Sequence, residues 1–300
     1  MQTSIVVLGI VALYIILEAV RELHTFRKVY YTVSARELNG MKRSRKVVFL
    51  SDLHNASYGK ENQRLYQAIR EEKPDIILIG GDMLVGKRSS SYEGTLSFLV
   101  RLAELCSVYY TNGNHEQKMK ENARFYEGRY DRYRSALEVN GVCVLENRQE
   151  AFLWDEAKIC LTGLEIPLWG YKKQGGKPVT KRDLDRLMKK KEDGFEIVLA
   201  HNPKYMKVYE KWGGNLFLSG HYHGGIVGFP GNRGILSPDF RLFPPYTAGK
   251  HKLSKKATAI ISRGLGVHTL PFRLWNPAEL VIITLQGEKG NGNSCKTAGI

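Results

Sequence analysis

The chain has 300 residues and a formal charge of +15, with 45 Lys and Arg against 30 Asp and Glu. Its hydrophobic content of 43% and aromatic content of 10% are those of a globular protein, and they exclude disorder throughout. Four Cys exclude a disulfide-built scaffold, and Cys106, Cys143 and Cys160 lie in apolar runs that predict buried, reduced thiols. The positive excess favours a polyanionic partner: a phosphate substrate, nucleic acid or anionic lipid.

The first 17 residues carry no charged side chain, and residues 5–17 are nearly all apolar. About 20 apolar residues are needed to span a bilayer, so this run is a short but sufficient candidate for a membrane anchor. A secretory signal peptide would need a basic start and a small-residue cleavage site, and the segment has neither. A buried core helix is the remaining alternative. We predict a single N-terminal transmembrane helix.

The flanking charges predict the orientation of this helix. No Lys or Arg precedes the apolar run, whereas eight follow it before residue 47, against three Glu. The positive-inside rule then places the rest of the chain in the cytoplasm, where thiols stay reduced. The same basic residues would attract anionic lipid headgroups. We therefore expect a single-pass protein of the cell membrane with a cytoplasmic catalytic domain.

From residue 46 the pattern alternates between short apolar runs and helical periodicity. The runs at 46–52, 75–82 and 107–116 predict strands, and the segments 62–72 and 95–105 between them predict helices. This order favours a parallel-type sheet with right-handed crossovers. Further short strands are expected at 141–148, 158–165, 195–201, 215–223, 257–264 and 279–285. Many strands after few helices predict two packed sheets.

Five of these strands are followed by residues that can bind a metal ion. They are Asp52 and His54, then Asp82, then Asn114 and His115, then His201, and finally His221 and His223. Ligands of open α/β sheets bind beyond the carboxyl ends of the strands, so these side chains are expected to converge in one cleft. Several flanking glycines permit the tight turns that such a site requires.

The combination of carboxylate, amide and imidazole groups suits two divalent transition metals. Asp82 stands alone after its strand and is the best candidate to bridge the pair. Two cations about 3.5–4 Å apart can hold one hydroxide between them and neutralise a phosphoryl group opposite it. The sequence therefore predicts a dinuclear site for phosphoester hydrolysis.

The ordered set of motifs resembles the calcineurin-like metallophosphoesterase superfamily. The motifs are D-x-H at 52–54, G-D at 81–82, G-N-H-E at 113–116, the strand-end His201 and G-H-x-H at 220–223, and the resemblance covers about residues 46–285. The segments 262–266, 271–273 and 276–280 are similar to a bacterial, membrane-associated branch related to UDP-2,3-diacylglucosamine pyrophosphohydrolases.

The resemblance implies a four-layer α/β/β/α sandwich and a role for each site residue. Metal one would be held by Asp52, His54, Asp82 and His223, and metal two by Asp82, Asn114, His201 and His221. His115 would face the phosphate, where it stabilises the transition state or protonates the leaving oxygen. Manganese is the first expectation for the two divalent ions, with iron, zinc and cobalt as alternatives. Glu116 is expected to be a structural partner of nearby backbone.

Three functions compete on the sequence alone. The first is a phosphodiesterase or pyrophosphohydrolase that uses a metal-bridging hydroxide on a membrane-associated or lipid-linked substrate. The second is a nucleotide or nucleic-acid phosphodiesterase, because residues 172–192 carry nine Lys and Arg against three acids, a net +6. The third is a non-catalytic metal-binding scaffold, which the complete ligand set disfavours.

The expected organisation is a membrane anchor at 1–20, a basic linker at 21–45, the catalytic domain at 46–285 and a disordered tail at 286–300.

Overall fold

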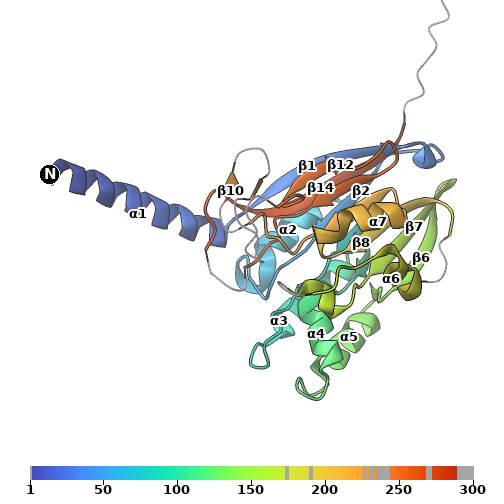
Figure 1. Ribbon diagram of the computed structural model, residues 1–300, viewed down its shortest axis with the longest axis horizontal. Helices are drawn as coiled ribbons and strands as arrows, with labels where there is room; N and C mark the ends of the chain where they lie inside the picture. Colours follow the sequence, from blue (N-terminus) through green and yellow to red (C-terminus); the bar gives the residue numbers. More distant parts are fainter. Residues whose placement is uncertain are drawn as a thin grey trace, which may run out of the picture.

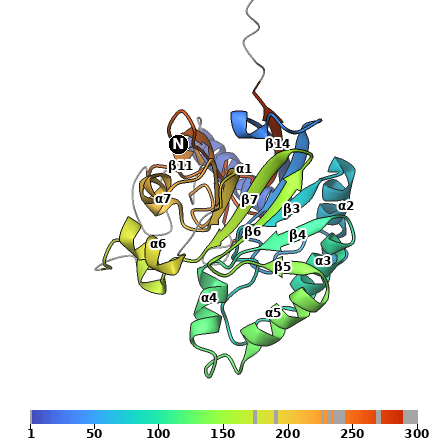
Figure 2. The ribbon, with the colours of Figure 1, turned by 90° about the vertical axis from the view of Figure 1, so that its right-hand side faces the viewer.

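The computed structural model describes residues 2–172, 176–188, 192–225, 228–229, 233–234, 244–267 and 272–288. Two six-stranded sheets pack face to face (Figures 1 and 2). The first sheet has the order β1 (Phe26–Ala35), β14 (Ala278–Gly287), β2 (Arg45–Leu50), β3 (Ile76–Ile79), β4 (Ser107–Tyr110) and β5 (Val142–Val144). The second has the order β12 (Gly249–Lys252), β13 (Thr258–Ile261), β9 (Leu216–Ser219), β8 (Phe195–Ala200), β7 (Ala157–Leu164) and β6 (Arg148–Trp154). Strands β10 (Gly228–Phe229) and β11 (Arg233–Gly234) form a separate hairpin.

Helices cover the outer face of each sheet, which gives the expected four layers (Figure 2). The first sheet is covered by α2 (Gln63–Glu72), α3 (Glu93–Ala103) and α5 (Arg129–Val139), and the second by α6 (Lys181–Leu187) and α7 (Met206–Trp212). Helix α4 (Asn114–Glu121) follows β4. Short 3-10 helices lie at Arg36–Leu38, Lys60–Asn62, Leu168–Tyr171 and Pro203–Tyr205.

The central strands are buried on both faces because each lies between a helix layer and the other sheet. In β2, Val47 and Phe49 point into the core between the sheets, whereas Val48 and Leu50 point towards the helices. This burial explains why the sequence shows continuous apolar runs rather than alternation. The strands β2, β3, β4 and β5 are parallel, as expected.

The segment expected to be a linker, 21–45, differs from that expectation. It contains the last turn of α1 (Gln2–His24) and the ten-residue edge strand β1, which pairs in parallel with β14. Strand β14 is antiparallel to β2, so the first sheet is mixed. At an edge only one face of β1 meets the core, and the strand therefore lacks the apolar run of its neighbours. Its partner β14 extends to Gly287, beyond the expected end of the domain at residue 285.

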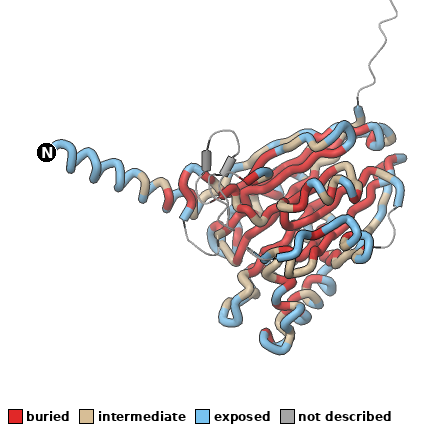
Figure 3. The backbone as a smooth tube through the Cα atoms, in the orientation of Figure 1, coloured by how far each residue is buried: buried red, intermediate tan, exposed pale blue. Residues whose placement is uncertain are grey.

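Helix α1 is long and apolar enough to cross a membrane. The candidate span is Thr3–His24, with a mean hydropathy of 2.4 and only 6% of the apolar window buried. Figure 3 shows this exposure along most of the helix, in contrast to the buried strands. A helix of this length that packed in a soluble core would be mostly buried.

Candidate metal centre

The predicted ligand residues lie just beyond the carboxyl ends of strands from both sheets. Asp52 is two residues beyond β2 and Asp82 three beyond β3, while His201 directly follows β8 and His221 is two residues beyond β9. The structure brings the side chains together in three groups, within each of which the ligand atoms are within 4.8 Å of one another. These groups are Asp52, His54 and His223; His54, Asp82 and His115; and Asp82, His201 and His221.

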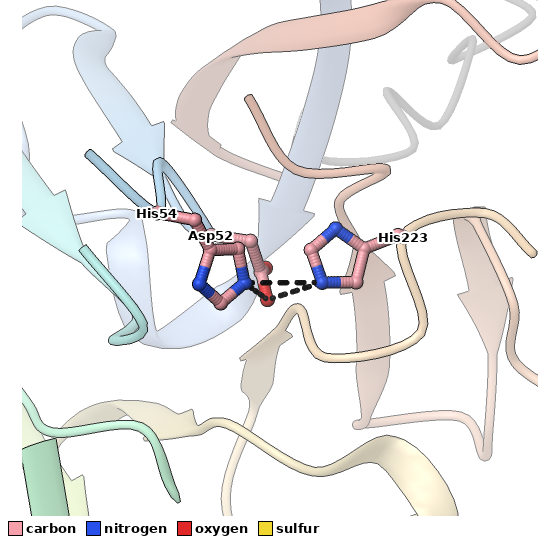
Figure 4. Close-up of side chains that lie close together, drawn as sticks. All are labelled: Asp52, His54 and His223. Carbon is pink, nitrogen blue, oxygen red and sulfur yellow. Dashed lines mark hydrogen bonds and ion pairs between the residues drawn. The ribbon is translucent and has the colours of Figure 1, made fainter. Parts of the chain in front are cut away.

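The first group joins two distant loops (Figure 4). Nε2 of His223 is 3.4 Å from Oδ1 of Asp52 and 3.2 Å from Nε2 of His54. The Asp52 carboxylate is fixed in turn by the backbone N–H of His221, which is 3.0 Å from Oδ1, and by the hydroxyl of Ser51. All three side chains thus direct one ligand atom to a common point.

Asp82 belongs to both of the remaining groups. Its Oδ2 lies 3.1 Å from Nε2 of His201 and 3.9 Å from Nε2 of His54. Its other oxygen, Oδ1, accepts a hydrogen bond of 2.8 Å from the backbone N–H of His115. His54 also belongs to the first group, so the Asp82 carboxylate lies between the first group and the last. This is the position that a bridging ligand requires.

Asn114 is the first residue of α4 and directly precedes His115, whose backbone N–H binds the Asp82 carboxylate. Oδ1 of Asn114 is buried and has no hydrogen-bond partner among the described residues. A buried amide oxygen without a donor costs free energy unless something else satisfies it. A divalent cation would do so, and the donor set of Asp, Asn and His fits such an ion.

Hydrogen bonds to the outer ring nitrogens orient two of the histidines. Nδ1 of His201 lies 2.7 Å from the carbonyl oxygen of Gly80, and Nδ1 of His223 lies 3.0 Å from that of Gly266. A carbonyl only accepts, so Nδ1 carries a proton in both rings and Nε2 faces the site, which is the usual arrangement around metal-binding histidines. Burial would lower the pKa of His201, but the charges of Asp82 and Asp52 raise it to about 10, so without a cation its Nε2 also carries a proton. A bound cation would replace that proton.

The charges around the site keep Asp82 ionised and two histidines neutral. Burial would raise the pKa of the Asp82 carboxyl, but His201 and two further histidines lower it well below its usual range. Burial lowers the pKa of His221 well below the usual value and also lowers the pKa of His223. Both imidazoles are therefore neutral at pH 7 and able to bind a cation.

The local backbone is unusual at several of these positions. Asp52, His54, Asp82, His221 and His223 all have positive φ, between 46° and 67°. Non-glycine residues rarely adopt this conformation, and such strain clusters at functional sites. The backbone of Gly113 also lies so close to Asp82 that no larger residue fits at position 113, since a Cβ there would lie 2.1 Å from Oδ1 of Asp82.

Glu116 supports the site from behind, as the sequence predicted. Oε2 accepts hydrogen bonds from the backbone N–H groups of Asp82 and Gly113, and Oε1 accepts from Leu84 N–H and the Tyr110 hydroxyl. Burial, together with the nearby Asp82 charge, raises the pKa of Glu116 to about 7. The side chain joins the loops after β3 and β4, and it does not project into the metal site.

Two residues near the site were not singled out from the sequence. The ring of Tyr171 lies 5.3 Å from that of His221 and 6.3 Å from that of His201, measured between centroids. Asn276 donates through Nδ2 to the carbonyl oxygens of His223 and Gly225, at 2.6 Å each. The segment N-P at 276–277 was part of the resemblance, but no feature of it indicated this contact.

A shared carboxylate between two clusters of histidine and oxygen ligands, at the strand ends of a four-layer sandwich, defines a metal-dependent hydrolase. Residues 45–225 match the family model for calcineurin-like phosphoesterases, and the chain belongs to this family. It is therefore a metal-dependent phosphoester hydrolase.

Curated proteins and solved structures are similar to this chain. Uncharacterized protein YpbG of Bacillus subtilis is 27% identical over 80% of this chain and 81% of its own length. A protein of Danio rerio described as a transmembrane protein with metallophosphoesterase domain is 26% identical, over 83% of this chain and 54% of its own length. The structure of phosphopantetheinyl hydrolase from Mycobacterium tuberculosis aligns with 72% of this chain and 88% of its own, at 11% identity and a TM-score of 0.46.

Proposed function

We propose that this protein is a membrane-anchored phosphodiesterase or pyrophosphohydrolase with two divalent cations. The first cation would be held by Asp52, His54, Asp82 and His223, and the second by Asp82, Asn114, His201 and His221. The observation that carries this proposal is the position of Asp82, whose Oδ2 lies 3.1 Å from His201 and 3.9 Å from His54. Manganese is the ion we expect first.

The two cations, when bound, would neutralise the phosphoryl charge and lower the pKa of the attacking water. Asp82 would keep them close together, and its low pKa keeps the carboxylate charged. His115 is placed to donate a proton from Nε2 to the leaving oxygen, since its other ring nitrogen accepts the N–H of Gly86 at 2.8 Å. Water would attack in line with that oxygen, on the opposite side of phosphorus.

The proposed substrate is a phosphodiester or pyrophosphate held at a membrane. Helix α1 supplies the anchor, and the basic residues after it favour a cytoplasmic domain next to anionic lipid. A membrane-bound enzyme meets lipid-linked substrates at high local concentration, whereas soluble substrates gain nothing from the anchor.

Asp82→Asn tests the proposal with little change of shape. The purified protein with added manganese should hydrolyse bis(4-nitrophenyl) phosphate and contain two transition metal ions per chain. Asp82→Asn should reduce both the rate and the metal content, while Asp131→Asn, on the exposed face of α5, should leave both unchanged. Wild-type activity in Asp82→Asn would refute the assignment.

A nucleotide or nucleic-acid substrate is the second candidate, and one observation favours it. Tyr171 packs beside His221 and directly precedes the basic segment 172–192, so that segment begins at the edge of the site. Residues 173–175 and 189–191 of the segment lie outside the described residues. Binding of a single-stranded oligonucleotide that weakens steeply with salt would support this candidate, and flat salt dependence would oppose it.

A further inference from the structure

Helix α1 joins the catalytic domain without a flexible spacer. It ends at His24 and β1 begins at Phe26, so Thr25 alone connects them. The Thr25 hydroxyl donates to the carbonyl oxygen of Arg21 at 2.8 Å and closes the last turn. On the side facing the domain, Ala19 is only 5% exposed and Glu22 only 2%. The helix direction is therefore fixed relative to the sheets.

A hydrogen-bonded path connects α1 to the metal site through Asn276. Oε2 of Glu22 accepts the backbone N–H of Asn276 at 2.9 Å. The Asn276 side chain donates to the carbonyl oxygen of His223 at 2.6 Å, and Arg273 donates to the Asn276 carbonyl and to that of Gly266. Gly266 in turn accepts Nδ1 of His223. The end of the helix and the candidate metal ligand His223 thus both form hydrogen bonds with Asn276.

Strand register places the site at the end of the domain from which α1 emerges. Val29 of β1 pairs with Val281, and Val281 pairs with Phe49 of β2. Because β2 runs opposite to β1, the three steps from Phe49 to Asp52 lead back towards the level of Phe26, by about 3.3 Å per residue. Figure 1 shows α1 continuing outward from this end, along the long axis of the molecule.

The apolar stretch of α1 ends close to the domain. Its last apolar residue before a charge is Leu17, and Ala19, two residues later, is already buried. At about 1.5 Å per residue, the surface of the domain therefore begins within one helical turn of the apolar stretch.

Two aromatic side chains are exposed at the same end. Trp275 is 55% exposed and Phe272 36%, and Trp275 directly precedes Asn276. Tryptophan is enriched at the membrane–water interface, where its ring combines an apolar body with a polar N–H. Three histidines of the ligand groups are partly open: His115 and His223, whose side chains are 16% and 13% exposed, and His221, which is of intermediate burial.

We propose that the metal-site end of the domain rests on the lipid bilayer, with α1 and the Phe272–Trp275 loop as two contacts, and that the substrate phosphoester belongs to a lipid headgroup. The substrate half of this inference rests on the proposed function, whereas the orientation does not. Soluble substrates would have to enter between the domain and the membrane, while a headgroup phosphate would already lie at the level of the open histidines.

The orientation is tested by fluorescence quenching of the full-length protein in nanodiscs. Lipids brominated near the headgroup end of their acyl chains quench only tryptophans that enter the bilayer interface. The chain has four Trp. We expect wild type to lose emission in brominated lipid, Trp275→Phe to lose much less, and Trp154→Phe to behave as wild type. Trp154 pairs with Ala157 at the amino end of β7, the opposite edge of the sheet from the site. Equal quenching in wild type and Trp275→Phe would overturn the orientation.

The substrate class is tested by two reporters in the same nanodiscs. One is bis(4-nitrophenyl) phosphate in solution, and the other is an aryl phosphodiester attached to a diacylglycerol. We expect Trp275→Ser to lower the ratio of the lipid-borne to the soluble rate by about tenfold, through loss of an interfacial aromatic contact. Leu153→Ser, which changes a 67% exposed residue at the opposite edge, should leave the ratio unchanged.

The outcomes separate this inference from the proposed function. Hydrolysis of the soluble reporter with none of the lipid-borne one would overturn the lipid substrate and leave the phosphodiesterase activity standing. Hydrolysis of neither would overturn the proposed function, while the quenching experiment would still decide how the domain sits on the bilayer.

Discussion

The backbone N–H of Gly86 donates a hydrogen bond to Nδ1 of His115, with 2.8 Å between the two nitrogens. In His201 and His223 the outer ring nitrogen instead faces a carbonyl oxygen. A neutral His115 must therefore carry its proton on Nε2, the atom that faces Asp82 Oδ2 at 4.0 Å. This ring can donate a proton into the site but, in that tautomer, cannot bind a metal there.

This tautomer predicts that variants of His115 have a lower kcat and retain the bound metal ions. Asn at position 115 keeps an acceptor for Gly86 but has no group at the place of Nε2, so kcat should fall about 10²–10⁴-fold. Gln can place its amide N–H near that position and should lose less. Both should retain the wild-type metal content by elemental analysis, unlike His201→Ala. Loss of metal from His115→Asn would show that this residue is a ligand.

We predict that substitution of Glu116 lowers the free energy of unfolding. All four groups that surround its carboxylate are donors: three backbone N–H groups and the Tyr110 hydroxyl. Glu116→Gln places an amide N–H₂ against two of them, and leaving buried donors unsatisfied costs about 1–3 kcal/mol. The free energy of unfolding in urea should fall by this amount. Glu121→Gln, later on α4, is the control, and an equal change in both variants would contradict the structural role of Glu116.

The sequence was sufficient to predict the four layers and the convergence of the metal ligands. Each ligand follows an apolar run, and parallel strands bring their carboxyl ends to one edge, so Asp52 and Asp82 had to lie close together. The order of residues along the chain determined this part of the site. The structure adds the two bonds that hold His201 and His223 in the metal-binding tautomer.

Other contacts depend on packing that leaves no local pattern. Glu22 and Asn276 are 254 residues apart, and a Glu at the end of an apolar helix normally indicates solvent. The burial of Glu22 depends on β1, the strand that follows α1. The sequence did not predict this strand, because β1 is an edge strand with only one face in the core and therefore shows a weak apolar pattern. Tyr171 lies in a 3-10 turn whose course is set by Val179 and Tyr205, which pack around Gly170.

Gly220 tests how tightly the loops around the site pack. A Cβ there would lie 2.0 Å from Oδ2 of Asp52 and 2.1 Å from the hydroxyl of Ser51. Gly220→Ala should therefore displace the Asp52 carboxylate, lower the metal content and reduce kcat. Gly94→Ala is the matched control, because a Cβ at Gly94 in α3 meets nothing within 4 Å. In a helix, Ala is favoured over Gly by about 1 kcal/mol, so the control should be as active and at least as stable as wild type. Unchanged metal binding in Gly220→Ala would show that the loop can move aside.

We predict that the Cys106 thiol resists alkylation at neutral pH. Burial, with a smaller effect from the Asp75 charge, raises the pKa of Cys106 to about 11. A raised pKa favours the neutral thiol, whereas only the thiolate reacts with the reagent. At pH 8 about 0.1% of Cys106 is therefore thiolate, compared with roughly a quarter of an ordinary thiol with a pKa of about 8.5. Labelling by iodoacetamide, followed by mass spectrometry of the Cys106 peptide, should be about 200-fold slower than that of glutathione at pH 8, and it should rise about tenfold per pH unit up to pH 10. Cys106 is half-buried in the structure, and labelling at the glutathione rate at pH 8 would show that the thiol is as open to water as that of a small molecule.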